Sequence, residues 1–166
     1  MRAVMDKSGD REQGIRTKRQ LVLIDIENLT GTPSPTHGDL SFAELKLREV
    51  ISDFDGAQCV VACSHRAAKT VAFSFPGAGR RWRSGPDGAD RALLDEMSDL
   101  RIMKRFDRLT LVSGDSIFTE AVAALGAAGI ETIVVSREHS LARRLRMAAL
   151  HVTTLPDREP TFAEAS

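Results

Sequence analysis

The sequence predicts a single α/β domain, a three-layer α/β/α sandwich built on a central, mainly parallel sheet. Short apolar runs alternate with helical segments five times along the chain, which is the pattern of a doubly wound sheet. The first run, Leu21 to Ile24, is unbroken, as expected for a strand buried on both faces. The length of 166 residues suits one domain with one sizeable core.

Composition excludes few partners but indicates where charge gathers. The chain has 23 basic and 23 acidic residues, so its bulk charge indicates neither a nucleic-acid nor a membrane partner. Arg and Lys nevertheless cluster in residues 1–20, 80–83 and 137–147, which is compatible with phosphate binding or with a solvated surface. We expect a cytoplasmic protein, because there is no long apolar stretch, no secretory signal and no cysteine pair spaced to form a disulfide.

The first predicted strand covers residues 20–26 and is followed by a segment rich in Gly, Pro and Thr. This segment, residues 27–40, is long for a connection after a central strand, and such loops are often functional. Ser41, with Glu44 three residues later, has the pattern of a capping box. We therefore expect a helix over 41–54.

The remaining elements alternate in the same way. The predicted strands are 57–63, 80–83, 108–112, 130–135 and 150–155, and the predicted helices are 65–73, 89–104, 116–128 and 139–148. The polar residues outside this pattern predict a flexible basic arm at 1–19, a domain at 20–155 and a polar tail at 156–166.

Three acids are expected to meet at one edge of the sheet. Asp25 ends the first strand, Asp115 follows the strand at 108–112, and Asp90 lies in the first turn of the helix at 89–104. In open parallel sheets ligands bind outside the carboxyl ends of the strands. Unpaired carboxylates that lie close together raise one another's pKa, and a divalent cation relieves this repulsion. The pattern predicts a metal site.

Each acid also has a structural interpretation. Asp90 could interact favourably with the helix dipole, and Asp115 could cap the following helix. Asp25 needs a partner, because it follows a buried run directly. Asp95 points about 140° away from Asp90 around the helix, so it is a secondary candidate. The other secondary candidates near this edge are Glu27, Ser113 and Ser116.

Three segments resemble the NYN domain family, a branch of the PIN-like ribonucleases. They are Asp25-Ile26-Glu27-Asn28, Gly88-Ala89-Asp90 and Ser113-Gly114-Asp115-Ser116-Ile117-Phe118, and the resemblance spans about residues 20–136. It implies a PIN-like fold, a Mg²⁺ or Mn²⁺ site and hydrolytic cleavage of RNA. It also implies that Asp25, Asp90 and Asp115 bind the metal with Asn28 beside them as the fourth catalytic residue.

One position of the last segment departs from the family pattern. Ile117 stands where the family turn often carries a second Asp, and isoleucine cannot bind a metal. Asp95 or Glu27 could take its place. A domain that binds RNA or a protein without cutting it therefore remains an alternative.

Several residues outside the acid cluster are candidates for contacting RNA. Arginine side chains can bind the phosphate backbone, and Trp82 could stack on a base or pack on the sheet. The candidates are Arg81, Trp82, Arg83, Arg137, Arg143 and Arg144. Nothing in the sequence indicates which class of RNA is bound, and a homodimer is possible.

A haloacid-dehalogenase-like phosphohydrolase is the other enzyme considered. It would use Asp25 and Glu27 as its acid pair, with Ser64, Lys69 and Asp115 in support. Glu27 is one methylene longer than the Asp expected there, and Asp90 would have no role.

Overall fold

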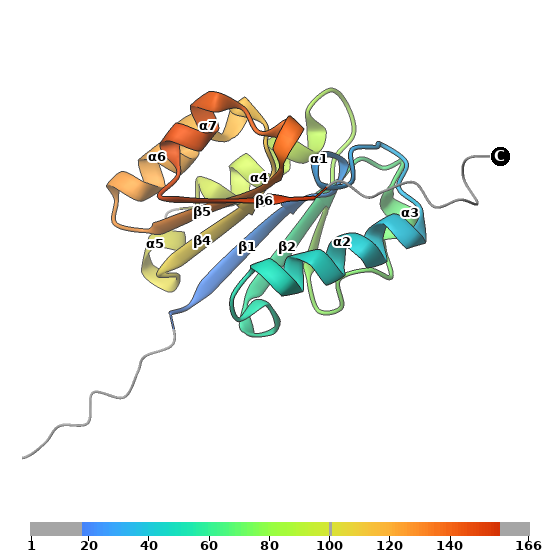
Figure 1. Cartoon of the computed structure of the whole chain (residues 1–166), viewed down its shortest axis with the longest axis horizontal. Coiled ribbons are helices and arrows are strands. Elements are labelled where there is room, and N and C mark those ends of the chain that lie inside the picture. The colour runs from blue at the N-terminus through green and yellow to red at the C-terminus, as the bar shows by residue number, and fades with distance from the viewer. Residues whose placement is uncertain (1–17, 100, 157–166) are drawn as a thin grey trace, which may run out of the picture.

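The computed structural model describes residues 18–99 and 101–156, and these form a six-stranded sheet with helices on both faces (Figure 1). The strand order is β3-β2-β1-β4-β5-β6, and every neighbouring pair is parallel. The predicted α/β sandwich is confirmed. Nearly all of the predicted arm and tail, residues 1–17 and 157–166, lies outside the described residues.

The strands and helices have the following bounds. The strands are β1 Gln20–Asp25, β2 Gln58–Cys63, β3 Gly79–Trp82, β4 Arg108–Val112, β5 Glu131–Arg137 and β6 His151–Leu155. The α-helices are α1 Ile26–Thr30, α2 His37–Val50, α3 Ala68–Val71, α4 Gly88–Met97, α5 Ile102–Arg105, α6 Thr119–Ala127 and α7 Arg143–Ala148. Short 3₁₀ turns cover Phe54–Gly56, Ser116–Phe118 and Glu138–Ser140.

Strand β1 lies at the centre of the sheet and divides the core in two. Leu21 and Leu23 pack on one face, with residues of α4, α6 and α7. Val22 and Ile24 pack on the other face, with residues of α1, α2 and α3. Successive side chains of a strand point to opposite faces, so a strand covered on both sides needs an unbroken apolar run. This explains the sequence of β1.

Helix α2 begins earlier than the sequence analysis predicts. Thr36 is its N-cap: the Thr36 hydroxyl accepts from the Asp39 backbone N–H at 3.1 Å, and the Asp39 carboxylate accepts from the Thr36 N–H at 2.8 Å. The predicted capping box at Ser41 is therefore wrong. The helix predicted over 41–54 is present, but its bounds are shifted to His37–Val50. The helix begins earlier because Leu40 already belongs to its buried face.

Several further predicted elements differ from the structure. The helices predicted over 65–73 and 139–148 are shorter, as α3 and α7. The segment 27–40 contains a helical turn, α1, because Ile26 and Leu29 are buried and Asp25 caps the turn. Helix α1 ends at Gly31, whose φ of 75° favours glycine. The predicted helix over 89–104 is divided into α4 and α5.

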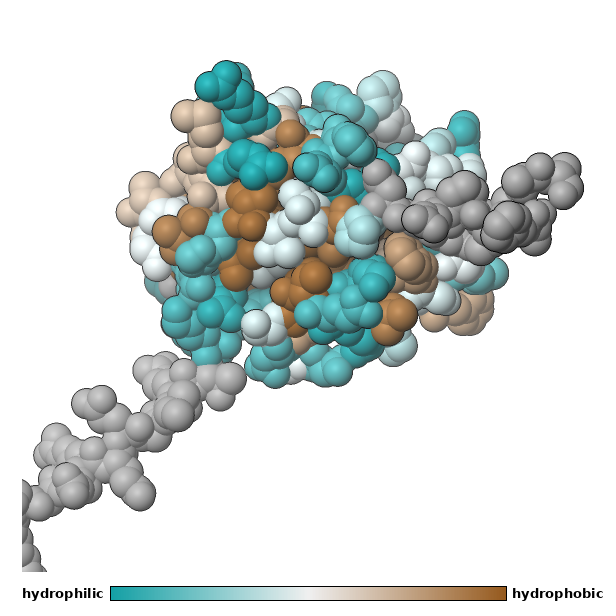
Figure 2. Space-filling model, in the orientation of Figure 1, coloured by the Kyte–Doolittle hydropathy of each residue, from teal (hydrophilic) through white to brown (hydrophobic). Residues whose placement is uncertain are grey.

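The surface in the orientation of Figure 1 is mixed. Hydrophobic residues gather across the middle of the view, where β6 and the end of α2 lie, and hydrophilic residues surround them (Figure 2). Within the described residues no helix is both long enough and apolar enough to cross a membrane.

Replacing Thr36 with Ala tests the observed start of α2. We expect Thr36→Ala to lower the free energy of unfolding by about 1 kcal/mol, because an N-cap hydrogen bond is lost. Ser41→Ala is the matched control and should change it by less than about 0.5 kcal/mol, because Ser41 is exposed inside the helix. Urea denaturation measures both, and a larger effect at Ser41 would contradict the assigned cap.

Candidate active site

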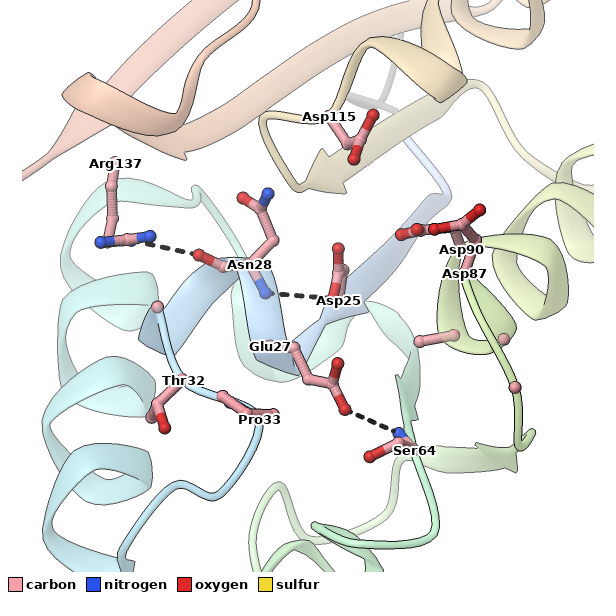
Figure 3. Close-up of a pocket in the computed structure, with 14 residues that line it drawn as sticks. Asp25, Glu27, Asn28, Thr32, Pro33, Ser64, Asp87, Asp90, Asp115 and Arg137 are labelled. Carbon is pink, nitrogen blue, oxygen red and sulfur yellow. Dashed lines mark hydrogen bonds between the residues drawn. The ribbon is translucent and has the colours of Figure 1, made fainter.

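A cavity of about 360 Å³ opens at the carboxyl edge of the sheet (Figure 3). It is lined by residues from the ends of β1 and β5, from α1 and the loop after it, from the loops after β2, β3 and β4, and from the start of α4. Five of the lining side chains are acidic: Asp25, Glu27, Asp87, Asp90 and Asp115. Arg137 is the single basic side chain among the lining residues, so the cavity is strongly negative.

Asp25 is fixed at the floor of this cavity. It is the last residue of β1 and only 4% exposed. One carboxylate oxygen accepts from the Asn28 backbone N–H at 3.2 Å, and the other accepts from the Ser113 hydroxyl at 3.0 Å. These bonds supply the partners that a carboxylate at the end of a buried strand requires.

Asp90 faces Asp25 from the first turn of α4 (Figure 3), and the two carboxyl groups lie close enough to shift each other's pKa. Partial burial raises the pKa of Asp90 to about 7, and the negative charge of Asp25 adds to the effect. Burial also raises the pKa of Asp25. The pair therefore takes up a proton at a higher pH than two separate aspartates would.

Asp115 is exposed at the mouth of the cavity. Its charge contributes to the raised pKa of Asp90. Its carboxylate accepts from the Ile117 backbone N–H at 2.9 Å and so caps the 3₁₀ turn at 116–118. Asp115 therefore both caps this turn and lies in the same cavity as the other acids.

Asn28 joins the loops after β1 and β4. Its side-chain oxygen accepts from the Gly114 backbone N–H at 2.8 Å. Gly114 lies so close to the Ser140 carbonyl oxygen that any Cβ at this position would overlap it. The turn needs a glycine here, and Asn28 then holds this turn beside Asp25.

Two other lining residues have defined partners. The Glu27 carboxylate accepts from the Ser64 backbone N–H at 3.1 Å, which ties it to the end of β2 (Figure 3). The Arg137 Nε donates to the Asn28 carbonyl oxygen at 3.1 Å, and its guanidinium lies against Gly31. A side chain at Gly31 would displace it.

Some predicted site residues lie outside the cavity lining. Asp95 is 76% exposed and pairs with Arg83 at 2.9 Å, so it does not replace the acid missing at Ile117. Ser116 and Ile117 are not lining residues either. Ser113 acts through its hydrogen bond to Asp25.

The RNA-binding candidates fall into three places. Arg81 pairs with Glu96 at 2.5 Å, and Trp82 is half-buried against the α2 side of the core, which favours its packing interpretation. Arg143 and Arg144 are exposed on α7, where Arg144 lies 3.6 Å from Glu120. Arg137 alone of the candidates reaches the cavity.

Asp87 is a lining residue that the sequence analysis missed. It precedes α4 with a φ of 55°, and its charge adds to the raised pKa of Asp90. In the sequence, Asp87 belongs to the turn Gly85-Pro86-Asp87-Gly88, where Asp is a common turn residue. Its place in the cavity lining was therefore not predicted. Asp87 precedes Asp90 by three residues, and this spacing could have indicated that the two acids lie on the same side of the helix start.

The cavity residues fit a divalent cation held by few protein ligands. No group of three or more His, Cys, Asp or Glu side chains in the described residues is arranged to hold a metal ion by itself. The close pair is Asp25 and Asp90, and Mg²⁺ is commonly bound by one or two carboxylates together with water and substrate phosphate. A pair that takes up a proton can exchange it for such an ion.

An all-parallel α/β sandwich with an acidic cavity at its carboxyl edge fits the PIN-like nuclease class. Residues 19–156 match the family described as NYN domain, and the chain belongs to that family. Members of this class are generally ribonucleases.

Solved structures support the fold independently. A crystal structure of a protein of unknown function from Vibrio parahaemolyticus matches with a TM-score of 0.56 and 15% identity. The match covers 87% of this chain and 97% of the other chain. At this identity the likeness shows the fold alone. No curated protein matches the sequence.

The phosphohydrolase alternative is not supported. Lys69, which it would place near Asp25, is exposed and absent from the cavity lining.

The raised pKa of Asp90 predicts how stability of the metal-free protein changes with pH. The folded pKa of about 7 exceeds the ordinary value of 3.8, so the folded state binds more protons between these values. The contribution of this group to stability is therefore lost as pH rises from about 4 to 7.

We expect Asp90→Asn to flatten this dependence. In the presence of a chelator it should raise the free energy of unfolding at pH 8 relative to wild type by about 1 kcal/mol, after discounting for solvent screening of a half-exposed group. Asp95→Asn, on the same helix but outside the cavity, should leave the pH profile unchanged. Denaturation at pH 5 and pH 8 measures both, and equal profiles for wild type and Asp90→Asn would contradict the pairing.

Proposed function

We propose that this chain is a Mg²⁺- or Mn²⁺-dependent ribonuclease that hydrolyses phosphodiester bonds at the acidic cavity. The observation that carries the proposal is that the Asp25 and Asp90 carboxyl groups face each other in one cavity, with the raised pKa of Asp90. An NYN domain makes RNA the expected substrate. Asp25, Asn28, Asp90 and Asp115 form the proposed catalytic set.

Each residue of the set has a defined task in this proposal. Asp25 is held rigidly by two hydrogen bonds, so it offers fixed oxygen ligands. Asp90 would supply a second carboxylate ligand for the ion, and Asp115 adds negative charge at the mouth. Asn28 holds the turn that contains Asp115 beside Asp25, through its hydrogen bond to Gly114. When bound, the ion polarises the scissile phosphate and lowers the pKa of a coordinated water.

Binding of RNA to so acidic a cavity requires compensation of charge. A bound ion would supply part of it, and Arg137 contributes from the opposite wall (Figure 3). A guanidinium carries five donors and suits a phosphate group. Arg143 and Arg144 extend the basic surface onto α7, although Arg144 pairs with Glu120, as Arg81 and Arg83 pair with Glu96 and Asp95.

An RNA-binding domain without cleavage activity is the second candidate. Ile117, in place of the family's second Asp, is the observation that favours it. Ile117 lies outside the cavity lining, however, and an acid there would have to reach in from the turn that Asp115 caps.

Asp25→Asn is the substitution that tests the proposed function. With mixed RNA and Mn²⁺, we expect it to reduce the cleavage rate by at least about a hundredfold, because a metal ligand is lost. Asp95→Asn is the control and should cleave like wild type. A chelator should abolish cleavage by wild type.

The outcomes of this experiment separate the candidates. Equal cleavage by wild type and Asp25→Asn would contradict the site. No cleavage by either, with RNA binding retained in a filter assay, would favour the non-cleaving domain.

A further inference from the structure

We propose that β6 is an interface at which two copies of this chain pair edge to edge in antiparallel orientation and extend the sheet across a two-fold axis. Strand β6 lies at one end of the sheet, and no strand of the described residues pairs with its outer side. This proposal does not rest on the proposed ribonuclease function.

The two edges of the sheet differ in how they are protected. Strand β3, at the far edge, has four residues and carries Arg80 and Arg81. Short length and charged side chains are common ways to block pairing with another chain. Strand β6 has the sequence His-Val-Thr-Thr-Leu and pairs with β5 residue for residue, so it has no proline, lysine or bulge within its span. Among the described residues it is an unpaired edge, and three of its five residues are β-branched.

Exposed apolar side chains lie next to this edge along the chain. Leu150, directly before β6, is 64% exposed, and Met147, on α7, is 76% exposed. In Figure 2 hydrophobic residues gather around the position of β6. A five-residue edge offers few hydrogen bonds, so burial of such side chains would have to contribute to a stable dimer.

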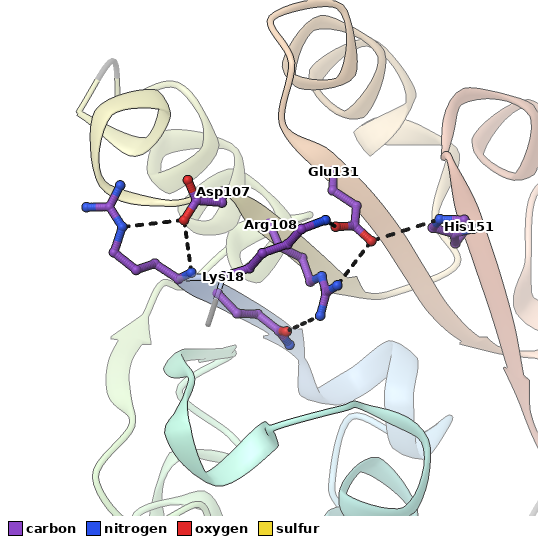
Figure 4. A network of polar contacts seen from close by, with 7 residues as sticks. Lys18, Asp107, Arg108, Glu131 and His151 are labelled. Carbon is purple, nitrogen blue, oxygen red and sulfur yellow. Dashed lines mark hydrogen bonds and ion pairs between the residues drawn. The ribbon is translucent and has the colours of Figure 1, made fainter. Parts of the chain in front are cut away.

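Strand β6 is also held firmly at its start. The Leu150 backbone N–H donates to the Thr132 hydroxyl at 3.2 Å. His151 lies 3.9 Å from the Glu131 carboxylate, which also pairs with Arg108 at 3.2 Å (Figure 4). The edge is therefore presented in one fixed position, which lowers the entropy cost of pairing.

A two-fold axis beside Thr153 gives a register in which β6 matches itself. Thr153 then faces the partner's Thr153, and Val152 faces the partner's Thr154. His151 faces the partner's Leu155, so no charged residue meets its own copy. Threonine and β-branched pairs are favourable cross-strand neighbours, whereas like charges in opposition are not. Any strand faces its own copy in this way, but β6 does so without bringing like charges or a proline to the interface, and this favours a second copy of the chain as the occupant.

Light scattering and sedimentation of the full chain test the proposal. The wild-type chain should reach twice its 18.1 kDa mass as concentration is raised over roughly a hundredfold range. Thr153→Lys and Thr153→Glu should each remain monomeric, because the axis places like charges opposite each other. An equimolar mixture of the two variants should form the dimer again, which also shows that both are folded.

Phe73→Lys is the control, because Phe73 is 87% exposed and follows α3 rather than β6. It should dimerise like wild type. A wild-type chain that stays monomeric would overturn the proposal. So would a dimer unaffected by either Thr153 variant, or a mixture that fails to restore the dimer.

Discussion

The electrostatic interaction between the Asp25 and Asp90 carboxyl groups, which face each other in the cavity, is the one on which the site depends. A carboxylate at the end of a strand buried on both faces is costly unless it is bonded. Here the Ser113 hydroxyl and the Asn28 backbone N–H bond it on one side, and Asp90 faces it on the other. When both carboxyl groups are ionised they repel each other, and a bound cation would relieve this repulsion.

The sheet makes this contact possible. Strand β1 pairs with β4 so that Ile24 lies opposite Val112, and the next residues along, Asp25 and Ser113, emerge together at the carboxyl edge. The apolar side chains of β1 fill both halves of the core, so a slip of one residue would move each of them to the wrong face. Core packing thus fixes the position of the acid.

Much of this could be predicted from local patterns. The run from Leu21 to Ile24 identifies a buried central strand, and strand ends identify Asp25 and Asp115. The rest depends on contacts between distant segments. The bond from Gly114 to Asn28, the pairing of Arg83 with Asp95, and the place of Asp87 at the cavity follow from how loops meet. The true cap at Thr36 was missed because Ser41 offers an equally good local pattern.

Binding of Mn²⁺ in the absence of RNA tests the central claim most directly. Calorimetry at pH 7.5 and pH 5.5 should show that wild type binds one ion, releases a proton on binding, and binds more weakly at the lower pH, where Asp90 is protonated. Asp90→Asn should bind weakly at both values, and Asp95→Asn should bind like wild type. Equal binding by wild type and Asp90→Asn, or affinity independent of pH, would contradict a metal site built on the carboxyl pair.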